Sequence, residues 1–170
     1  MEFKNLTKER YSCRSLSERK VEREKIEEII EIARLAPTAV NRQPIKIFAM
    51  DSEDAKENIR KSTRCIYGAD TFLVVGYKED EAWVREFDNR NFGDIDAGIV
   101  ATHILLAISS LGLNTTWVGH FDAPLLKEKY PEMKDYELIA LFPIGYAAED
   151  GGPSDRHFQR KSKDEIISYL

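Results

Sequence analysis

The sequence predicts a domain of mixed helices and strands, in which the two kinds of element alternate along the chain. Its 170 residues are enough for one domain with a sizeable core. Hydrophobic patterns typical of helices and of strands follow one another, and they predict about four strands and about six helices. Apolar residues make up 42% of the chain and charged residues 32%, a balance typical of soluble globular proteins. We therefore expect residues 1–170 to form a single domain.

The first half of the chain contains two predicted helices and two predicted strands. Between residues 22 and 35, apolar side chains recur at the i, i+3, i+4, i+7 spacing of an amphipathic helix, and Pro37 ends it. The segment 45–50 (IKIFAM) is a predicted strand, and 72–77 (FLVVGY) is a predicted buried strand. Residues 52–62 form a predicted surface helix, whose first residue is a serine, a preferred N-cap.

The long helix predicted over residues 94–113 is unusual in its composition. Its middle, residues 97–108, is apolar on nearly every face, which indicates burial on all sides. In a chain of this length, such a helix either runs through the core or lies at an interface between subunits. Gly112 fits the position directly after a helix end.

The last third of the chain continues the alternation. Residues 114–119 (NTTWVG) and 136–146 (YELIALFPIGY) are predicted strands, separated by a short helix over 122–130. The sequence Ser-Lys-Asp-Glu at 162–165 is a capping box that begins a final helix. The polar stretch 147–161 is long for a simple connection, and loops of that length are often functional.

Composition argues against several classes of protein. The net charge of −5 and pI near 5.4 disfavour nucleic-acid binding. The sequence contains no run of eighteen apolar residues, so it predicts no membrane span. Two cysteines without a CxxC pair fit a reducing cytoplasm, and the scattered histidines predict no metal site. The charged N-terminus lacks the apolar region of a secretory signal. Dinucleotide-binding, P-loop and GxSxG motifs are absent from the sequence.

The first candidate site is RYSCRSL, residues 10–16. Arginine forms two-pronged hydrogen bonds with phosphate, and Arg10 and Arg14 would share one face if the segment were helical. Ser12 adds a neutral donor between them. By spacing alone, a solvated basic edge is the simpler explanation of the pair. Cys13 lies near positive charge, but no partner base marks it as a nucleophile.

Three further segments carry polar groups that could bind a ligand. The loop APTAVNRQP (36–44) lies between two prolines, and its amide and hydroxyl side chains suit a flat heteroaromatic ring. The segment LFPIGY (141–146) is a strand that could free backbone amides at its end, and HFQRK (157–161) is a second basic cluster. Each segment has a plain structural explanation by itself: a capped turn, a strand exit or a solvated charge.

Taken together and in this order, these segments resemble the nitroreductase family of FMN-dependent oxidoreductases. RYSCR matches the family's Arg-x-Ser-x-Arg opening, and APTAVNRQP matches its Pro-Ser/Thr-Ala-x-Asn-x-Gln-Pro loop. Residues 94–119 match the family's central helix and following strand, and residues 141–167 match its C-terminal signature. The resemblance therefore covers nearly the whole chain.

The resemblance implies an α+β fold with a central antiparallel-rich mixed sheet flanked by helices, assembled as an interlocked homodimer. FMN would lie in a cleft between the subunits, and the apolar central helix would lie at their interface. At the phosphate the family pattern places backbone contacts of Tyr11 and the side chains of Arg10, Ser12 and Arg14 with Arg160 or Lys161. Around the isoalloxazine, the partner subunit would supply Pro37, Thr38, Ala39 and Asn41, with Gln43 near the ring's edge. One flank of the flavin would be lined by Trp117, Val118, Gly119, Pro143, Ile144 and Gly145.

The activity implied by the resemblance is NAD(P)H-dependent reduction of an electron-poor acceptor, such as a nitroaromatic or a quinone, by a ping-pong mechanism. The flavin carries this chemistry, and the protein supplies binding and electrostatics, so no side chain is assigned as a general acid or base. A non-catalytic FMN-binding or sensing protein with the same pocket is the alternative. Two departures from the family pattern are Ile45, where many relatives have tryptophan, and the brief charged segment 78–91, where longer relatives carry helices that cover the substrate.

Overall fold

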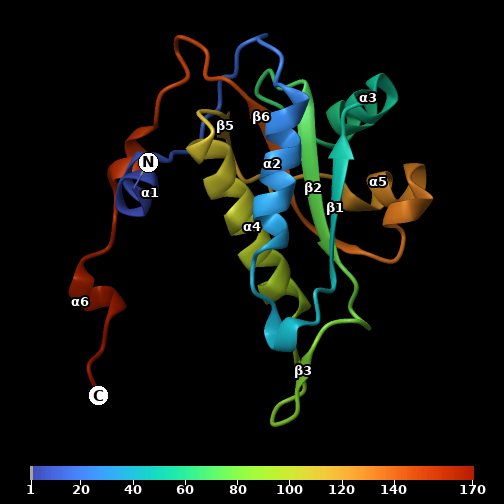
Figure 1. The fold of residues 1–170 in the computed structure, drawn as a ribbon, viewed down its shortest axis with the longest axis vertical. Coiled ribbons are helices and arrows are strands. Elements are labelled where there is room, and N and C mark those ends of the chain that lie inside the picture. The colour runs from blue at the N-terminus through green and yellow to red at the C-terminus, as the bar shows by residue number, and fades with distance from the viewer. Residues whose placement is uncertain (1) are drawn as a thin grey trace.

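The computed structural model describes residues 2–170 and has an antiparallel sheet at its centre (Figure 1). The strand order is β1-β2-β6-β5, and each strand pairs antiparallel with its neighbours. The strands are β1 (Ile45–Met50), β2 (Thr71–Tyr77), β5 (Asn114–Thr115) and β6 (Glu137–Gly145). The sheet confirms the predicted strands at 45–50, 72–77 and 136–146. The predicted strand at 114–119 is shorter than expected, since only its first two residues belong to β5.

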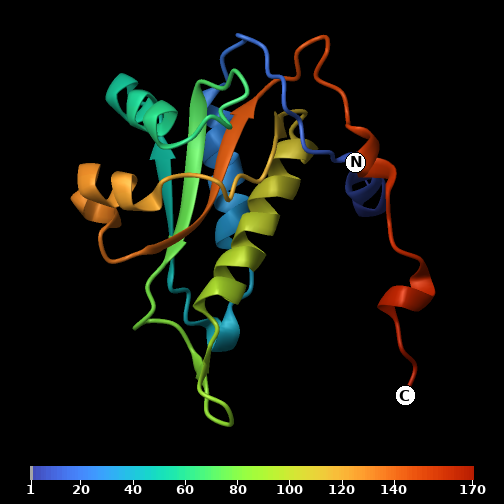
Figure 2. The same ribbon diagram turned by 180° about the vertical axis from the view of Figure 1, so that it is seen from behind.

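Helices cover both faces of this sheet. The helices α2 (Arg23–Arg34) and α4 (Gly93–Ser110) pack on one face, and α3 (Glu53–Ser62) and α5 (Ala123–Lys129) lie on the other (Figures 1 and 2). The alternation of side chains along β2 divides the core in two. Leu73 and Val75 pack with α2 and α4, whereas the neighbouring side chains point to α3 and α5. The two-layered burial explains why β2 reads as a continuous apolar run.

Both ends of α4 are fixed by glycines. At the N-terminal end, a Cβ on Gly93 would lie 2.2 Å from ring carbons of Tyr77, so only glycine allows this approach of helix to sheet. At the C-terminal end, Gly112 has φ +73° and its N–H donates to the Ser109 carbonyl at 3.2 Å. The following N–H, of Leu113, donates to the Ile108 carbonyl at 3.0 Å, which completes a Schellman motif.

The outer face of α4 is open in the single chain. The face toward α2 and the sheet is fully buried, but Ile95 is 39% exposed, and Ile99, Leu105 and Leu106 are only partly buried. The apolar composition predicted burial on all sides, but within one chain only the face toward α2 and the sheet is buried. By length and hydropathy alone, α4 is the single helix among residues 2–170 that could cross a membrane, but its packing against α2 and the sheet explains the same composition.

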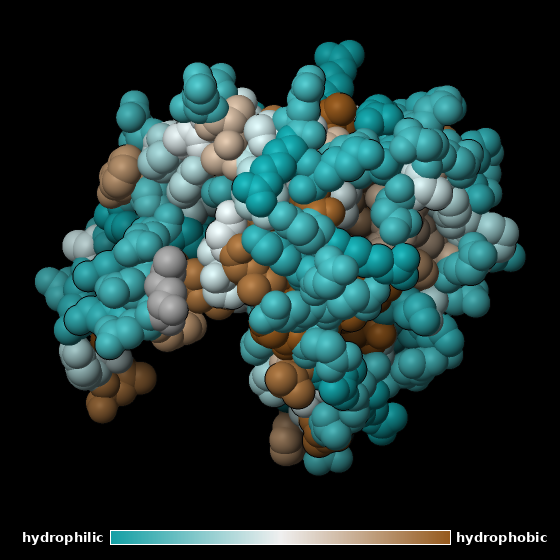
Figure 3. All heavy atoms as spheres, turned by 45° about the horizontal axis from the view of Figure 1, so that its top comes forward, coloured by the Kyte–Doolittle hydropathy of each residue, from teal (hydrophilic) through white to brown (hydrophobic). Residues whose placement is uncertain are grey.

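The chain ends form an arm that stands away from the body. The first helix, α1 (Phe3–Glu9), lies beside the C-terminal stretch that carries η3 (Asp155–Phe158) and α6 (Lys163–Ile166) (Figures 1 and 2). Ser162 caps α6 through the predicted capping box. All residues of 158–170 are exposed, including Phe158, Ile166 and Tyr169. Figure 3 shows a deep indentation between this arm and the body, with hydrophobic side chains along it.

A hairpin and two short helical turns complete the fold. The strands β3 (Val84–Arg85) and β4 (Arg90–Asn91) pair as a hairpin that leads into α4, and η1 (Ala39–Asn41) and η2 (Pro131–Met133) are single 3-10 turns. Trp83 packs against Phe92 at the base of the hairpin, with ring centroids 4.9 Å apart. The segment 78–91, expected to be brief and charged, is therefore an ordered hairpin without helices.

Candidate functional site

The segment 10–16 is extended, which corrects the helical arrangement considered from the sequence. The helix α1 ends at Glu9, and Arg10 already has extended backbone angles. Ser12 then forms a parallel bridge with Thr115, and Leu16 forms an antiparallel bridge with Ala147. The physical reason is that the edge strand β5 and the residues that follow β6 offer backbone partners, which an isolated helical turn here would lack.

The extended backbone places alternate side chains on opposite sides of the segment. Arg10, Ser12 and Arg14 line one cavity together, whereas Cys13 is fully buried on the other side. Tyr11 also faces away from this cavity, and its hydroxyl donates to the Gly151 carbonyl at 2.6 Å. Arg10 and Arg14 do lie on one side of the segment, as the sequence suggested. The cause is the two-residue alternation of an extended strand and not the spacing of a helix.

The cavity beside these side chains has a volume of about 180 Å³ and a strongly basic lining. Its opposite wall comes from the C-terminal arm and consists of Ser154, Arg156, His157 and Arg160. Lys161, the other cation predicted there, is exposed and does not line it. Ser154, Arg156 and His157 were not among the predicted site residues. Arg156 could have been found from the sequence, because it lies four residues before the predicted Arg160.

Four arginines meet at this cavity without an acidic partner. Within residues 2–170, Arg10, Arg14, Arg156 and Arg160 form no ion pair with a carboxylate. Burial and the nearby charge of Arg160 lower the pKa of Arg10. The folded chain therefore holds repelling cations together, an arrangement that an anion would relieve. A phosphate fits both the charge and the two-pronged geometry of these side chains.

Tyr67 lies close to Arg14, one of the arginines that line the cavity. A hydrogen bond with the Cys65 side chain and burial raise the pKa of Tyr67, and the Arg14 guanidinium partly opposes this shift. The Tyr67 carbonyl accepts the Leu16 N–H at 2.9 Å, so the 63–68 turn supports the extended segment from behind. Arg14 is thus placed between a supported backbone and a neutral phenol.

The predicted flank residues lie next to this extended segment. Val118 pairs with Leu141 of β6, and the Trp117 ring contacts Phe142 with centroids 5.5 Å apart. Trp117 is 38% exposed and Gly119 is exposed, so both are available to a ligand.

The segment at 143–145 differs from the strand exit that the sequence suggested. Pro143, Ile144 and Gly145 remain within β6 and are buried, with Ile144 paired to both Thr71 and Thr115. The strand does not end before them, so they offer no run of freed backbone amides. They support the site from within the sheet.

The loop at 36–44 has a strained backbone. Val40, Asn41 and Gln43 have φ values of 44°, 57° and 53°, in the left-handed region that favours glycine. Thr38 Oγ1 accepts the Gln43 N–H at 3.0 Å, and Gln43 Nε2 donates to the Asn41 carbonyl at 3.2 Å. Pro37, Asn41 and Gln43 are exposed, and Thr38 and Ala39 are partly exposed. The loop presents polar atoms to its surroundings while its backbone is held by internal bonds.

The loop and the basic cavity lie at opposite ends of α4. The Ala39 N–H donates to Asp96 near the start of the helix, whereas Tyr11 and Arg10 border a small cavity with Ser109 and Gly112 at its end. The helix has 18 residues, which corresponds to a length of about 27 Å at 1.5 Å per residue. The two predicted parts of the site are therefore far apart within one chain.

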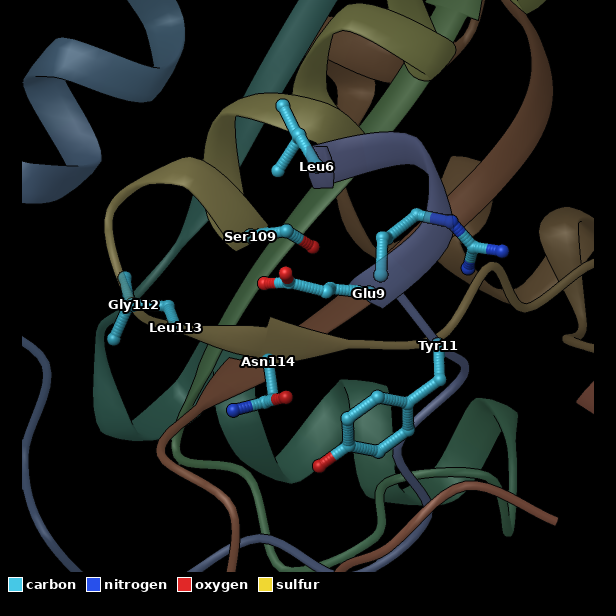
Figure 4. Close-up of a pocket in the computed structure, with 8 residues that line it drawn as sticks. Leu6, Glu9, Tyr11, Ser109, Gly112, Leu113 and Asn114 are labelled. Carbon is cyan, nitrogen blue, oxygen red and sulfur yellow. The ribbon is translucent and has the colours of Figure 1, made fainter. Parts of the chain in front are cut away.

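The small cavity at the end of α4 has a volume of about 160 Å³ and shares Arg10 with the basic cavity, but its other lining residues differ (Figure 4). The side chains of Glu9, Ser109 and Asn114 gather in it, with Leu6 above them. It has one carboxylate and no cluster of cations apart from Arg10, so it does not match an anion as the first cavity does.

Comparison with known proteins decides the family. The model of the nitroreductase family matches residues 7–67 and 63–146 of the chain. The chain belongs to the nitroreductase family. It is 25% identical to the Bacillus subtilis protein named as the NAD(P)H nitroreductase YdgI over 91% of this chain and 93% of that one. The resemblance drawn from the sequence is confirmed.

Solved structures of nitroreductases share this fold. A crystal structure of a nitroreductase family protein from Clostridium difficile superposes with a TM-score of 0.91, at 35% identity over 99% of this chain and 98% of that one. A protein from Exiguobacterium sibiricum, described as a nitroreductase and solved in complex with FMN, superposes with a TM-score of 0.84 at 21% identity, covering 100% and 98% of the two chains. The expected nitroreductase fold, with helices on an antiparallel sheet, is therefore confirmed.

Proposed function

We propose that this nitroreductase family member is an FMN-dependent oxidoreductase that uses NAD(P)H to reduce electron-poor small molecules. The observation that carries the proposal is the basic cavity, where four arginines without acidic partners surround a space that suits one phosphate. The name of the Bacillus subtilis relative and the FMN complex of the Exiguobacterium protein support the same cofactor and electron donor.

In this proposal the phosphate of FMN is held by the cavity described above. Arg10, Ser12 and Arg14 form one wall, and Arg160 with Arg156 forms the other. The guanidinium groups neutralise the phosphate, and the extended backbone fixes their spacing. Trp117 and Gly119, exposed next to this wall, border the flavin along one flank, and the buried 143–145 segment supports them.

The distance between the two parts of the site supports a homodimer. One FMN molecule is shorter than α4, so it cannot reach from the basic cavity to the loop at 36–44 of the same chain. Two copies related by a two-fold axis would place the loop of one beside the cavity of the other. The open apolar face of α4 and the indentation beside the C-terminal arm provide the surface for such an assembly (Figure 3).

The bound flavin supplies the redox chemistry, accepting hydride from NAD(P)H and passing electrons to an acceptor such as a quinone or a nitroaromatic. Arg10, Ser12 and Arg14 would hold the phosphate, and Trp117 with the 36–44 loop of the partner subunit would border the ring. Donor and acceptor would use the site in turn, which is a ping-pong mechanism. The hairpin of β3 and β4 replaces a larger cover, so the substrate pocket is open at this side.

The test is to purify the protein, titrate it with FMN, and record flavin absorbance under argon before and after adding NADH or NADPH. We expect stoichiometric FMN binding, bleaching by the pyridine nucleotide and recovery on adding a quinone or nitroaromatic. FMN binding without bleaching would favour the non-catalytic sensing alternative. A protein that does not take up FMN would refute the proposal.

A further inference from the structure

The buried carboxylate of Asp96 stands out among the residues that the proposed mechanism does not use. It lies in the first turns of α4 and is 1% exposed. Its Oδ1 atom accepts the Ala39 N–H at 2.8 Å. Its Oδ2 atom is buried and has no hydrogen-bond partner within residues 2–170. A buried carboxylate oxygen without a donor costs free energy, so its presence needs an explanation.

Asp96 lies in a part of the helix that is fixed by close packing and hydrogen bonds. Gly93 at the start of α4 packs directly on the Tyr77 ring, and its N–H donates to Asn91 Oδ1 at 2.8 Å. The Asp96 N–H donates to the Phe92 carbonyl at 2.8 Å. The N-terminal end of a helix also stabilises a nearby negative charge. The carboxylate is therefore fixed relative to the sheet, and it can fix whatever it binds.

What Asp96 binds is the strained loop. Three of its residues have left-handed backbones, and a β-branched residue such as Val40 adopts that region only when its surroundings hold it there. Its side chains are largely exposed, so little packing holds the loop. Besides the Asp96 bond, the side-chain bonds of the loop are the Thr38–Gln43 and Gln43–Asn41 bonds within it. Within residues 2–170, the Asp96 bond is the side-chain hydrogen bond that ties the loop to the core.

We propose that Asp96 is a positioning residue of the cofactor site, whose buried carboxylate holds the Thr38–Gln43 loop in the left-handed conformation that presents it to the flavin of the other subunit. This inference rests on the proposed function, because the loop has a cofactor to border only if the protein binds FMN. A neutral side chain would satisfy the Ala39 N–H at a smaller desolvation cost. A carboxyl oxygen is a strong acceptor, and its bond to the loop offsets part of the cost of burial.

The experiment compares Asp96→Ala and Asp96→Asn with Asp94→Asn, using the homodimeric protein as purified. Asp94 lies on the same helix turn but is exposed and pairs with Arg90 at 2.9 Å, away from the loop. Hydrogen exchange of peptides covering residues 37–44 reports the loop without any cofactor, and an FMN titration reports the site. Circular dichroism checks that each variant is folded.

We expect Asp96→Ala to accelerate exchange in the loop roughly tenfold and to raise the Kd for FMN by a similar factor, since one charged hydrogen bond is lost. Asp96→Asn keeps an oxygen acceptor for Ala39 but a weaker one, so both effects should be smaller than in Asp96→Ala without disappearing, and Asp94→Asn should change neither. Unchanged loop exchange in Asp96→Ala would overturn the proposal. Faster exchange with unchanged FMN affinity would also overturn it, because the bond would then be purely structural.

Thr38→Val provides a second route if Asp96→Ala does not fold. It removes the acceptor of the Gln43 N–H while leaving the buried carboxylate in place. We expect faster hydrogen exchange of the loop than in the unmodified protein but slower exchange than in Asp96→Ala, and unchanged exchange would overturn the claim that side-chain bonds hold the loop. If the unmodified protein does not bind FMN, the proposed function fails by itself, and loop exchange still shows whether Asp96 holds the loop.

Discussion

The two ends of helix α4 are organised in opposite ways. At its C-terminal end, the segment 10–16 has a relaxed extended backbone, and the charges of its arginines are unbalanced. At its N-terminal end, the loop 38–43 has a strained backbone that is held by hydrogen bonds of Thr38, Gln43 and Asp96. In the proposed function, the first end binds the phosphate through its positive charge, and the second end borders the flat ring through its fixed backbone conformation. A ligand such as FMN, which has a charged phosphate and a flat ring, needs both kinds of site.

The largest effect is expected from removing charge at the first end. Arg14→Ala should weaken FMN binding by about 1.5–3 kcal/mol, roughly 10- to 150-fold in Kd, because a charged hydrogen bond to the phosphate is lost. The stability of the FMN-free protein should not fall, since the change reduces repulsion among the arginines. Arg60→Ala, at a surface arginine paired with Asp70 at 3.2 Å, is the matched control. Equal FMN affinity in Arg14→Ala and the control would contradict the electrostatic role.

A second prediction concerns how the arm is attached to this end. A Cβ at Gly151 would lie 2.5 Å from the Ser15 carbonyl oxygen, so Gly151→Ala should destabilise the fold by about 1–3 kcal/mol. FMN affinity should fall as well, because the arm carries Arg156 and Arg160.

The neighbouring glycine serves as the control for this change. A Cβ at Gly152 would meet no atom within 4 Å, and Gly152→Ala should change the stability by less than about 0.5 kcal/mol. Urea unfolding and FMN titration measure both effects. Equal stability of the two variants would show that the arm is not held at Gly151.

At the other end of α4, relieving strain should stabilise the protein. A left-handed backbone costs about 1–2 kcal/mol for a residue with a side chain, and glycine loses about 0.5–1 kcal/mol through its flexibility. Val40→Gly, at φ 44°, should therefore raise the free energy of unfolding by about 0.5 kcal/mol. Val84→Gly, at an exposed position in β3, should lower it. If both variants lose stability in urea, Val40 is not strained.

The smallest effect is expected from lowering the pH, which acts on Glu22 near the C-terminal end of α4. A hydrogen bond from Tyr146, 2.6 Å away, and one from Arg19 lower the pKa of Glu22 to about 2. Because the folded pKa lies below the usual value of 4.5, this contribution to stability is complete above about pH 4.5 and is lost as the pH falls toward 2. The difference in urea midpoint between the protein and Glu22→Gln should shrink over that range. A constant difference would contradict this linkage.

The sequence predicted the elements whose pattern is local. The helix α3 begins after Ser52 and the helix α6 after Ser162, as the capping residues indicated, and the Schellman glycine ends α4. The apolar run of β2 predicted a strand buried on both faces. Each of these features depends on residues within a few positions of one another, so one sequence is enough to find them.

Features that depend on distant partners were missed. The segment 10–16 is extended because β5 and the residues after β6 pair with its backbone, and its own seven residues do not show this. The roles of Arg156 and Ser154 depend on the arm folding back against Arg10. The separation of the 36–44 loop from the basic cavity depends on the length of α4. The resemblance to the family provided the list of residues, and only the fold shows that the list divides into two separate groups.

The alternation along residues 10–16 also determines how this segment can change. Cys13 lies directly before Arg14 and three positions after Arg10, so in an extended backbone it points away from both arginines, and the display of the cations and the protection of the Cys13 thiol have one common cause. Insertion or deletion of one residue would reverse both at once, turning guanidinium groups into the core and exposing a thiol to oxidants. Substitutions can adjust the strength of this site, but changes in its length would abolish it.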